Sequence, residues 1–280
     1  GKGIIGMTTK DDDFVENVIA VNSHSYLLMF TNKGKIYVKK AYTIPESGRT
    51  SKGTNIVNLI ELSEGEKVTA LISTDSFDGD RYLTMITRQG VIKRTSLSEF
   101  EIQRKGGKIA LSLDEDDDLL YVRLTDDNSK MLIATKNGYA VFFRLGDIRP
   151  LGRTARGVRA VRLEEGDEVA GVAVEEDGRL VMTITEKGYG KRSEFSEYPI
   201  HNRGGKGVRC HNTERTGRIA GIASVAEDDD IMIITSTGTI IRTHASDIPV
   251  YGRSAGGVIV MRQSEDSRIV NFTCLDCKDD

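Results

Sequence analysis

A basic, glycine-bearing loop recurs along the chain and leads into strand-like runs. In its clearest copy, Gly152-Arg153-Thr154-Ala155-Arg156-Gly157 precedes Val158-Arg159-Ala160-Val161. Arginine and lysine can neutralise phosphate oxygens, and glycine lets backbone N–H groups approach those oxygens closely. The loops are therefore candidate phosphate-binding elements. The copies lie at residues 1–3 (cut short), 48–53, 103–107, 152–157, 202–207 and 252–257.

The last glycines of these loops are almost evenly spaced. They fall at Gly3, Gly53, Gly107, Gly157, Gly207 and Gly257, in steps of 50, 54, 50, 50 and 50 residues. A fixed period of this size indicates a repeat architecture in which each unit is one supersecondary element.

Residues 68–113 show what one unit contains. The runs Val68–Thr74, Tyr82–Thr87, Val91–Leu97 and Lys108–Leu113 are rich in β-branched and aromatic residues, which predicts four strands. Glycine supplies the positive φ that a tight hairpin turn requires. Four strands per repeat predict a blade, and several blades predict an all-β, propeller-like ring. The predicted hairpin turns are residues 32–34, 88–90, 136–138, 186–188 and 236–238.

The two ends of the chain bear on the number of blades. First strands start near Val18, Val68, Leu119, Val169, Ile219 and Ile269, whereas only five glycine hairpins occur. We therefore expect five complete blades and a sixth that both termini supply, from Arg268–Leu275 and Ile4–Thr9. The whole of residues 1–280 is expected to form one domain.

Charge is distributed unevenly, although the formal net charge is only −3. Acidic residues gather in turns such as 61–66, 114–118 and 164–168, and basic residues gather in the glycine loops and in the strands that leave the hairpins. Equivalent positions of a repeat should line one track, with the acidic groups elsewhere. A continuous positive track is typical of a protein that binds duplex phosphates. The predicted DNA-contact residues are Lys2, Lys39, Lys40, Arg49, Lys52, Lys93, Arg94, Arg104, Lys105, Lys108, Arg144, Arg153, Arg156, Lys191, Arg192, Arg203, Lys206, Arg242 and Arg253.

The sequence also favours one mode of DNA binding over others. No aromatic residues are interleaved with the basic loops, which argues against a stacking platform for single strands. No segment has the pattern of a recognition helix, so reading of bases in the major groove is not expected. Two other functions stay open: a protein-interaction propeller, and an enzyme that would need converging catalytic groups at the ring's centre.

Other classes find less support. No run of about 18 apolar residues occurs and the N-terminus has no apolar signal core, so a cytoplasmic location without membrane contact is expected. Cys274 and Cys277 form a lone C-x-x-C, which we interpret, with Cys210, as reduced thiols rather than a metal site. We expect neither a catalytic site nor a metal site in this chain.

Several longer motifs point to one family. Gly1-Lys2-Gly3 matches the end of a basic box, Gln-Arg-Arg-Gly-Gly-Lys-Gly, and residues 103–109 and 203–207 look like degenerate copies of it. The segments Asn55-Ile56-Val57-Asn58-Leu59 and Gly188-Tyr189-Gly190-Lys191-Arg192 are typical of blades in the same family. On these residues the chain resembles, nearly end to end, the C-terminal domain of the A subunit of bacterial DNA gyrase.

The resemblance implies a fold and a function. The fold would be a six-bladed β-pinwheel, whose blades exchange strands with their neighbours. The function would be wrapping of duplex DNA around a basic rim without base specificity, which gives gyrase the chiral wrap for negative supercoiling. The domain would be the non-catalytic part of an ATP-dependent type II topoisomerase. The related C-terminal domain of the A-type subunit of topoisomerase IV is the near alternative.

The resemblance also implies partners. They are the N-terminal part of the gyrase A subunit, which holds the catalytic tyrosine, and the gyrase B subunit, which holds the ATP site, in a heterotetramer. The isolated domain is expected to be monomeric. No cofactor is expected in this chain, because ATP and magnesium are implied for the holoenzyme only.

Overall fold

The computed structural model describes residues 3–5, 19–21, 24–40, 60–101 and 106–275. The chain divides into two compact units. Unit 1 comprises Gly1–Asp127 and Asp147–Val158, and unit 2 comprises Asn128–Gly146 and Arg159–Asp280. The expectation of one domain over residues 1–280 stays a prediction, and each unit is described by itself.

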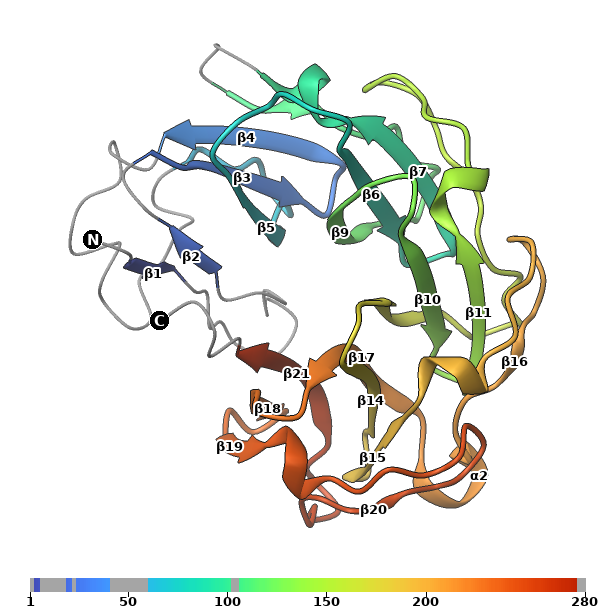
Figure 1. The fold of residues 1–280 in the computed structure, drawn as a ribbon. Coiled ribbons are helices and arrows are strands. Elements are labelled where there is room, and N and C mark those ends of the chain that lie inside the picture. The colour runs from blue at the N-terminus through green and yellow to red at the C-terminus, as the bar shows by residue number, and fades with distance from the viewer. Residues whose placement is uncertain (1–2, 6–18, 22–23, 41–59, 102–105, 276–280) are drawn as a thin grey trace. The chain divides into compact units, whose positions relative to one another are not determined.

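Unit 1 is built from short antiparallel strands (Figure 1). A single 3-10 turn, η4 (Leu97–Phe100), follows its second hairpin. The strands are β1 (Gly3–Ile5), β2 (Ile19–Val21), β3 (Tyr26–Thr31), β4 (Lys35–Lys40), β5 (Val68–Thr74), β6 (Tyr82–Thr87), β7 (Val91–Ser96), β8 (Lys108–Ile109) and β9 (Leu119–Thr125), with β12 (Val158–Arg159) at its boundary.

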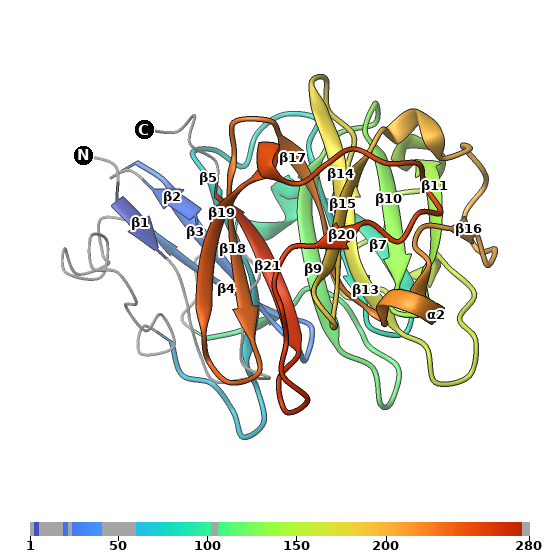
Figure 2. The same ribbon diagram turned by 90° about the horizontal axis from the view of Figure 1, so that it is seen from below.

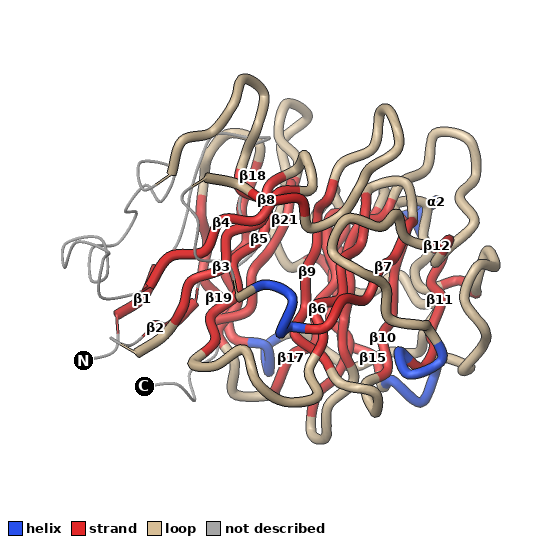
Figure 3. Tube along the Cα trace, turned by 90° about the horizontal axis from the view of Figure 1, so that it is seen from above, coloured by secondary structure: helices blue, strands red, loops and turns tan. Residues whose placement is uncertain are grey.

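Unit 2 repeats the plan, and Figure 3 shows how little helix accompanies the strands. The strands are β10 (Lys130–Thr135), β11 (Tyr139–Arg144), β13 (Val169–Val174), β14 (Arg179–Thr185), β15 (Tyr189–Ser193), β16 (Val208–Arg209), β17 (Ile219–Ala226), β18 (Asp230–Thr235), β19 (Ile240–His244), β20 (Val258–Ile259) and β21 (Ile269–Leu275). The helical turns are η5 (Leu145–Asp147), η6 (Phe195–Glu197), α2 (Thr213–Thr216) and η7 (Ala245–Asp247).

Each large sheet has a hairpin at its centre and borrows its outside strands from later repeats. The sheet orders are β5-β3-β4-β8, β9-β6-β7-β12, β13-β10-β11-β16, β17-β14-β15-β20 and β21-β18-β19. We call the strand beside the first hairpin strand the inner strand and the two-residue strand beside the second hairpin strand the outer strand. The inner strand comes from the next repeat, and the outer strand follows the basic loop that comes after the next hairpin. Figure 2 shows one outer strand, β20, beside β15. The implied exchange of strands is confirmed. The grouping of residues 68–113 into one blade is wrong, because β5 and β8 join the hairpin before them and only β6 and β7 stay together.

The prediction of a sixth blade from both termini is not confirmed. β21 pairs with β18 along Asp230↔Leu275 to Thr235↔Ile269, so it completes the fifth sheet as its inner strand. β1 pairs with β2 instead of meeting β21. The described residues therefore form five blade-like sheets and one two-stranded sheet.

A threonine fixes the start of every hairpin turn. Its carbonyl accepts the N–H of the glycine three residues on, at 3.0 or 3.1 Å, and its hydroxyl accepts the N–H of the residue after that glycine, at 3.1 to 3.4 Å. The register of the hairpin with its inner strand shifts at the same residue in all five sheets. The five threonines are Thr31, Thr87, Thr135, Thr185 and Thr235, and all of them are buried.

The core lies between successive sheets of one unit. In unit 1, Leu28 and Phe30 of one sheet pack in a cluster with Leu83 and Met85 of the next. In unit 2, one cluster joins the sheets of β10 and β14 and another joins the sheets of β14 and β18. The first strand of the first hairpin is therefore buried on both faces, as Leu27–Phe30 show, and its sequence is an apolar run rather than an alternation.

Gly188 offers a test of this packing at a hairpin turn. Its φ is +96°, and a Cβ there would lie 1.9 Å from the carbonyl oxygen of Met261. Gly178 also has a positive φ, +77°, but a Cβ there would meet nothing within 4 Å. Both Gly→Ala changes should cost about 1–2 kcal/mol for the backbone conformation, and Gly188→Ala should cost about 1–3 kcal/mol more for the clash. Urea unfolding followed by circular dichroism measures the difference, and equal losses would contradict the close approach.

Candidate nucleic-acid interface

The loop arginines make one contact that repeats along the chain. The guanidinium Nη1 of Arg153 donates to the carbonyl oxygen of Ile109 at 3.2 Å, that of Arg203 to Arg159 at 2.9 Å, and that of Arg253 to Arg209 at 2.6 Å. In each case the acceptor lies 44 residues earlier, on the second residue of an outer strand. Each basic loop is thus tied to the outer strand of the preceding repeat.

This contact leaves the arginines available to a ligand. A guanidinium has five N–H donors in a fixed plane, and the repeated bond uses only one of its nitrogens. Arg203 is exposed, and Arg153 and Arg253 are partly exposed. The arrangement holds a cation at an equivalent place in three repeats, with donors left over for an anion such as phosphate.

The second cation of two loops is paired with an acid. Lys206 Nζ lies 2.7 Å from Glu164 Oε1, and Arg156 forms an ion pair with Asp114. The hydrogen bond from Lys206 lowers the pKa of Glu164, and the same bond raises the pKa of Lys206. Both acids come from the turn one repeat earlier. The expectation that acidic groups lie apart from the basic loops is therefore wrong at these two places.

Two of the predicted strand cations are buried lysines. Lys93 and Lys191 have 0% exposure, and their ammonium groups donate to loop carbonyl oxygens. Burial lowers the pKa of each to about 8. Neither ammonium can reach a phosphate without moving the loop above it.

Two predicted arginines are buried beside those lysines. Arg94 donates to the carbonyl of Ile148 at 2.8 Å and to Asp127 Oδ1 at 2.6 Å, and it stacks on Tyr82 with its guanidinium carbon 4.1 Å from the ring centroid. Arg192 donates from Nε to the carbonyl of Ile248 at 2.6 Å. These two arginines hold the segment that enters the next loop rather than presenting charge to solvent.

The remaining strand cations do not occupy one repeated position. Counted from the hairpin glycine, Lys93 and Lys191 are third, Arg94, Arg192 and Arg242 fourth, Lys39 fifth, and Lys40 and Arg144 sixth. Lys40, Arg144 and Arg242 are exposed, Arg242 pairing with Asp230 at 3.0 Å, and Lys39 and Lys108 are partly buried. The strand cations that do recur at the third and fourth positions are buried except Arg242, so the loop arginines are the recurrent cations that solvent reaches in three described repeats. Lys2, Arg49, Lys52, Arg104 and Lys105 lie outside the described residues.

Two cations that the sequence analysis missed stand next to the loops. Arg159 and Arg209 are the second residues of β12 and β16, and their carbonyls receive the loop arginines. Arg159 is exposed, and Arg209 lies over the ring of Tyr139 at 4.6 Å. Both arginines could have been found from the sequence, because Gly-Val-Arg is repeated at the end of these two loops. Each arginine adds one cation beside a loop arginine.

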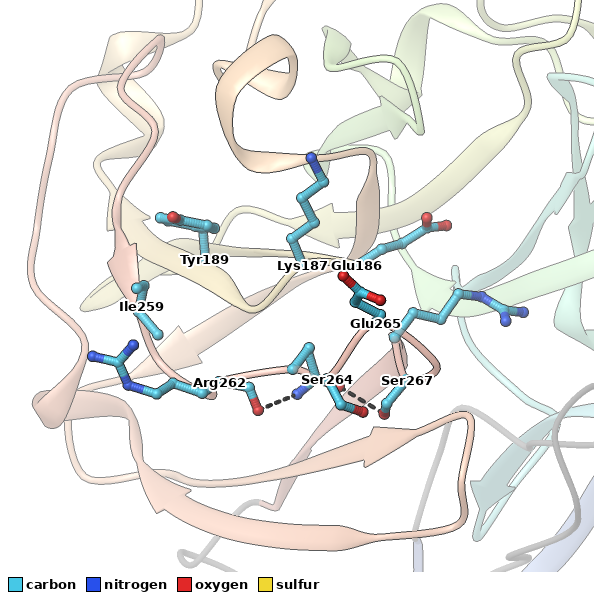
Figure 4. A pocket seen from close by; sticks show the side chains of 10 residues that line it. Glu186, Lys187, Tyr189, Ile259, Arg262, Ser264, Glu265 and Ser267 are labelled. Carbon is cyan, nitrogen blue, oxygen red and sulfur yellow. Dashed lines mark hydrogen bonds between the residues drawn. The ribbon is translucent and has the colours of Figure 1, made fainter.

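A hollow of about 460 Å³ lies elsewhere in unit 2, between the β14–β15 turn and the segment that joins β20 to β21. Figure 4 shows Lys187 and Glu186 on the turn side and Arg262 and Glu265 opposite them. None of the predicted DNA-contact residues lines this hollow. Within the described part of the chain, no cluster of three His, Cys, Asp or Glu residues could hold a metal ion, and no helix is long and apolar enough to cross a membrane.

Comparison with known proteins agrees with the architecture. The family profile described as "DNA gyrase C-terminal domain, beta-propeller" matches residues 1–22, 25–75, 81–126, 129–174, 179–226 and 229–276. The A subunit of DNA gyrase from Clostridium acetobutylicum is 48% identical over 159 residues, and that from Haloquadratum walsbyi is 47% identical over 165 residues. These alignments cover 57% and 58% of the chain but only 19% of each relative, so the chain matches about a fifth of their length.

Solved structures show the same fold. The "Structure of DNA gyrase A C-terminal domain" superposes with a TM-score of 0.79 at 26% identity and covers 98% of this chain and 92% of that one. The "Crystal structure of the C-terminal domain of DNA topoisomerase IV" superposes with a TM-score of 0.85 at 25% identity and covers 97% of this chain and 85% of that one.

The division between buried and exposed strand arginines can be tested by stability. Arg94→Ala removes a buried side chain and leaves the carbonyl of Ile148 without its donor, so it should lower the free energy of unfolding by about 3 kcal/mol. Arg144 is exposed, and Arg144→Ala should change it by no more than about 0.5 kcal/mol. Urea titration of both variants measures the difference. Equal stability of the two would mean that Arg94 is not the structural residue described above.

Proposed function

Since the chain belongs to the DNA gyrase C-terminal domain family, we propose that it binds duplex DNA through its phosphates and wraps it along the loop cations. The observation that carries this proposal is the arginine contact repeated every 50 residues, at Arg153, Arg203 and Arg253. A repeated, anchored cation can bind a repeated anion, and the backbone of duplex DNA is such an anion.

The proposed contacts are to the backbone and carry no base readout. The loops are short, and their side chains are held by main-chain carbonyls on one side, so they present charge rather than a surface shaped to a base edge. Arg156, Lys206 and Arg159 would add contacts beside the loop arginines. The buried residues Lys93, Arg94, Lys191 and Arg192 are left out of the proposed contact set, because their polar groups are engaged inside the protein.

The relatives' names support a proposed role in a larger enzyme. The chain would be the non-catalytic part of a cytoplasmic DNA gyrase, in which it continues from the rest of the A subunit and works with the B subunit. ATP and magnesium would act elsewhere in that enzyme. Bending DNA costs elastic energy, and phosphate contacts spread along a curved path would offset it. The similarity to a topoisomerase IV domain makes that enzyme the second candidate.

Salt dependence tests the proposal. The affinity of the full chain for duplex DNA should fall linearly on a log–log plot against salt, with about −0.9 of slope for each phosphate contact. Arg153→Ala combined with Arg156→Ala should reduce the slope by about 1 to 2 and weaken binding. Lys187→Ala combined with Arg262→Ala removes the same charge outside the loops and should leave the slope close to that of the wild type. A flat salt response would refute DNA binding, and a protein-interaction function would then be preferred.

The acids beside the loops should weaken DNA binding. Asp114 forms an ion pair with Arg156, and Glu164 forms one with Lys206. A phosphate that binds either cation must therefore compete with a carboxylate. Asp114→Asn combined with Glu164→Gln should raise the affinity by about twofold to fivefold at low salt, and the gain should shrink as salt screens it. The control, Glu176→Gln with Asp228→Asn, makes the same change in charge at exposed sites away from the loops. If the control gains as much, net charge rather than local competition explains the effect.

A further inference from the structure

Two buried lysines each bind carbonyl oxygens of a basic loop, Lys93 two in the loop at 152–157 and Lys191 three in the loop at 252–257. Lys93 Nζ donates to the carbonyl oxygens of Ala110 at 2.5 Å, Gly152 at 2.9 Å and Arg153 at 2.7 Å. An ammonium group has three N–H donors, so every donor of Lys93 is used.

The second lysine repeats this arrangement in the other unit. Lys191 Nζ donates to the carbonyl oxygens of Gly252 at 3.0 Å and Ala255 at 2.8 Å, and also to that of Arg253. Both lysines stand third after their hairpin glycine and are followed by a buried arginine. Both loops read Gly-Arg-x-Ala.

The β10–β11 hairpin, which also has an outer strand, shows that the lysine occurs together with one loop sequence. At the equivalent position of β11 stands Val141, which is buried. The loop whose following strand pairs with β11 reads Asn202-Arg203-Gly204-Gly205-Lys206 instead. An apolar side chain is therefore compatible with the sheet, and the lysine is specific to the Gly-Arg-x-Ala loops.

We propose that Lys93 and Lys191 are positioning residues for DNA contact, which fix the loop arginines Arg153 and Arg253 in the orientation that a phosphate requires. The proposal rests on the proposed function. Each of these arginines is held at both ends: its own carbonyl is bound by the lysine below, and its guanidinium is bound by the outer strand of the preceding repeat. A side chain fixed in this way loses little further freedom when it binds a ligand, which raises affinity.

The lysines also remove an unfavourable group from the binding surface. A backbone carbonyl oxygen carries partial negative charge, and two or three such oxygens facing outward would repel a phosphate. The ammonium groups draw the carbonyls of Gly152, Arg153, Gly252 and Arg253 inward. A neutral side chain at position 93 or 191 would leave these oxygens without their charged donor.

The proposal predicts an unusual dependence on pH. Desolvation lowers the pKa of both lysines to about 8, with Glu99 and Arg153 facing Lys93, and Cys210, Arg253 and Glu197 facing Lys191. His211 also lies in the electrostatic surroundings of Lys191, and Tyr198 shares the neighbours Cys210, Arg253 and Glu197 with that lysine. Raising the pH through 8 deprotonates the lysines, weakens their hold on the loops and should lower DNA affinity.

Stability should respond in the opposite direction. The folded-state pKa lies below the unfolded value of about 10.5, so the unfolded chain binds more protons between the two values. Raising the pH over that range therefore increases the contribution of these lysines to the free energy of unfolding. A purely structural role gives no reason for DNA affinity to fall while this contribution rises.

The test uses the full chain with Lys93→Met and Lys191→Met, singly and together, and Lys187→Met as the control for loss of an exposed lysine. The double variant should bind duplex DNA about tenfold more weakly than the control. It should also lack the fall in affinity between about pH 7 and about pH 9 that is expected of the wild type. Amide hydrogen exchange should become faster in residues 252–257 of Lys191→Met, while exchange in β14 stays as in the wild type.

The outcomes separate this inference from the proposed function. If the wild type fails to bind duplex DNA, the proposed function is wrong. If the wild type binds and the double variant matches the control in affinity and pH profile, the positioning role is overturned and DNA binding stands. If the double variant does not fold, the single variants and the pH series of the wild type decide, and a flat wild-type profile across pH 8 overturns the inference.

Discussion

The structure depends on pairing between the outer edge of a hairpin and a two-residue strand from the next repeat, which four of the five described hairpins have. The pairs keep one register: Lys35↔Ile109 in one sheet, Tyr139↔Arg209 in another and Tyr189↔Ile259 in a third. A strand edge that is left bare presents unpaired N–H and C=O groups to water or to other chains. Because the chain must return to the preceding hairpin to cover that edge, it must cross between sheets, and the crossing segment is the basic loop.

The crossing explains why the loop has its composition. It passes close to the main chain of the preceding hairpin. At Gly157, for example, no side chain would fit, because a Cβ would lie 2.3 Å from the carbonyl oxygen of Ile92. Its carbonyls are left without strand partners, and Lys93 or Lys191 satisfies them from below. The same geometry that completes the sheet therefore sets the loop arginines at its surface, so that stability and the proposed phosphate binding share one set of contacts.

The sequence was sufficient to predict the strands and their turns, but not their partners. Val68–Thr74 and Tyr82–Thr87 have the predicted bounds, and all five glycine hairpins are present. Local pattern states that a run is a strand and does not state which strand lies beside it. The sequence also could not show which of two neighbouring cations in a strand is exposed. Lys93 and Arg94 are both buried because the sheet is covered on both sides, whereas a strand with one solvent-facing side would expose one of them. In the turn at 114–118, Asp117 is buried and accepts the N–H of Gln89, while Asp114 is exposed and pairs with Arg156.

The fifth hairpin shows what the borrowed strand does to the side chains beneath it. No strand among the described residues pairs with the outer edge of β19, and Ile240 is 45% exposed there. At the equivalent position of covered hairpins, Ile36 is 1% exposed and Ile92 is 0% exposed. Arg242 follows the same rule, because its side chain is 60% exposed whereas that of Arg94 is fully buried. Since burying one isoleucine is worth about 1.5–3 kcal/mol, the returning strand stabilises the hairpin that it covers. It also decides whether a cation at that position faces solvent or holds the next loop in place.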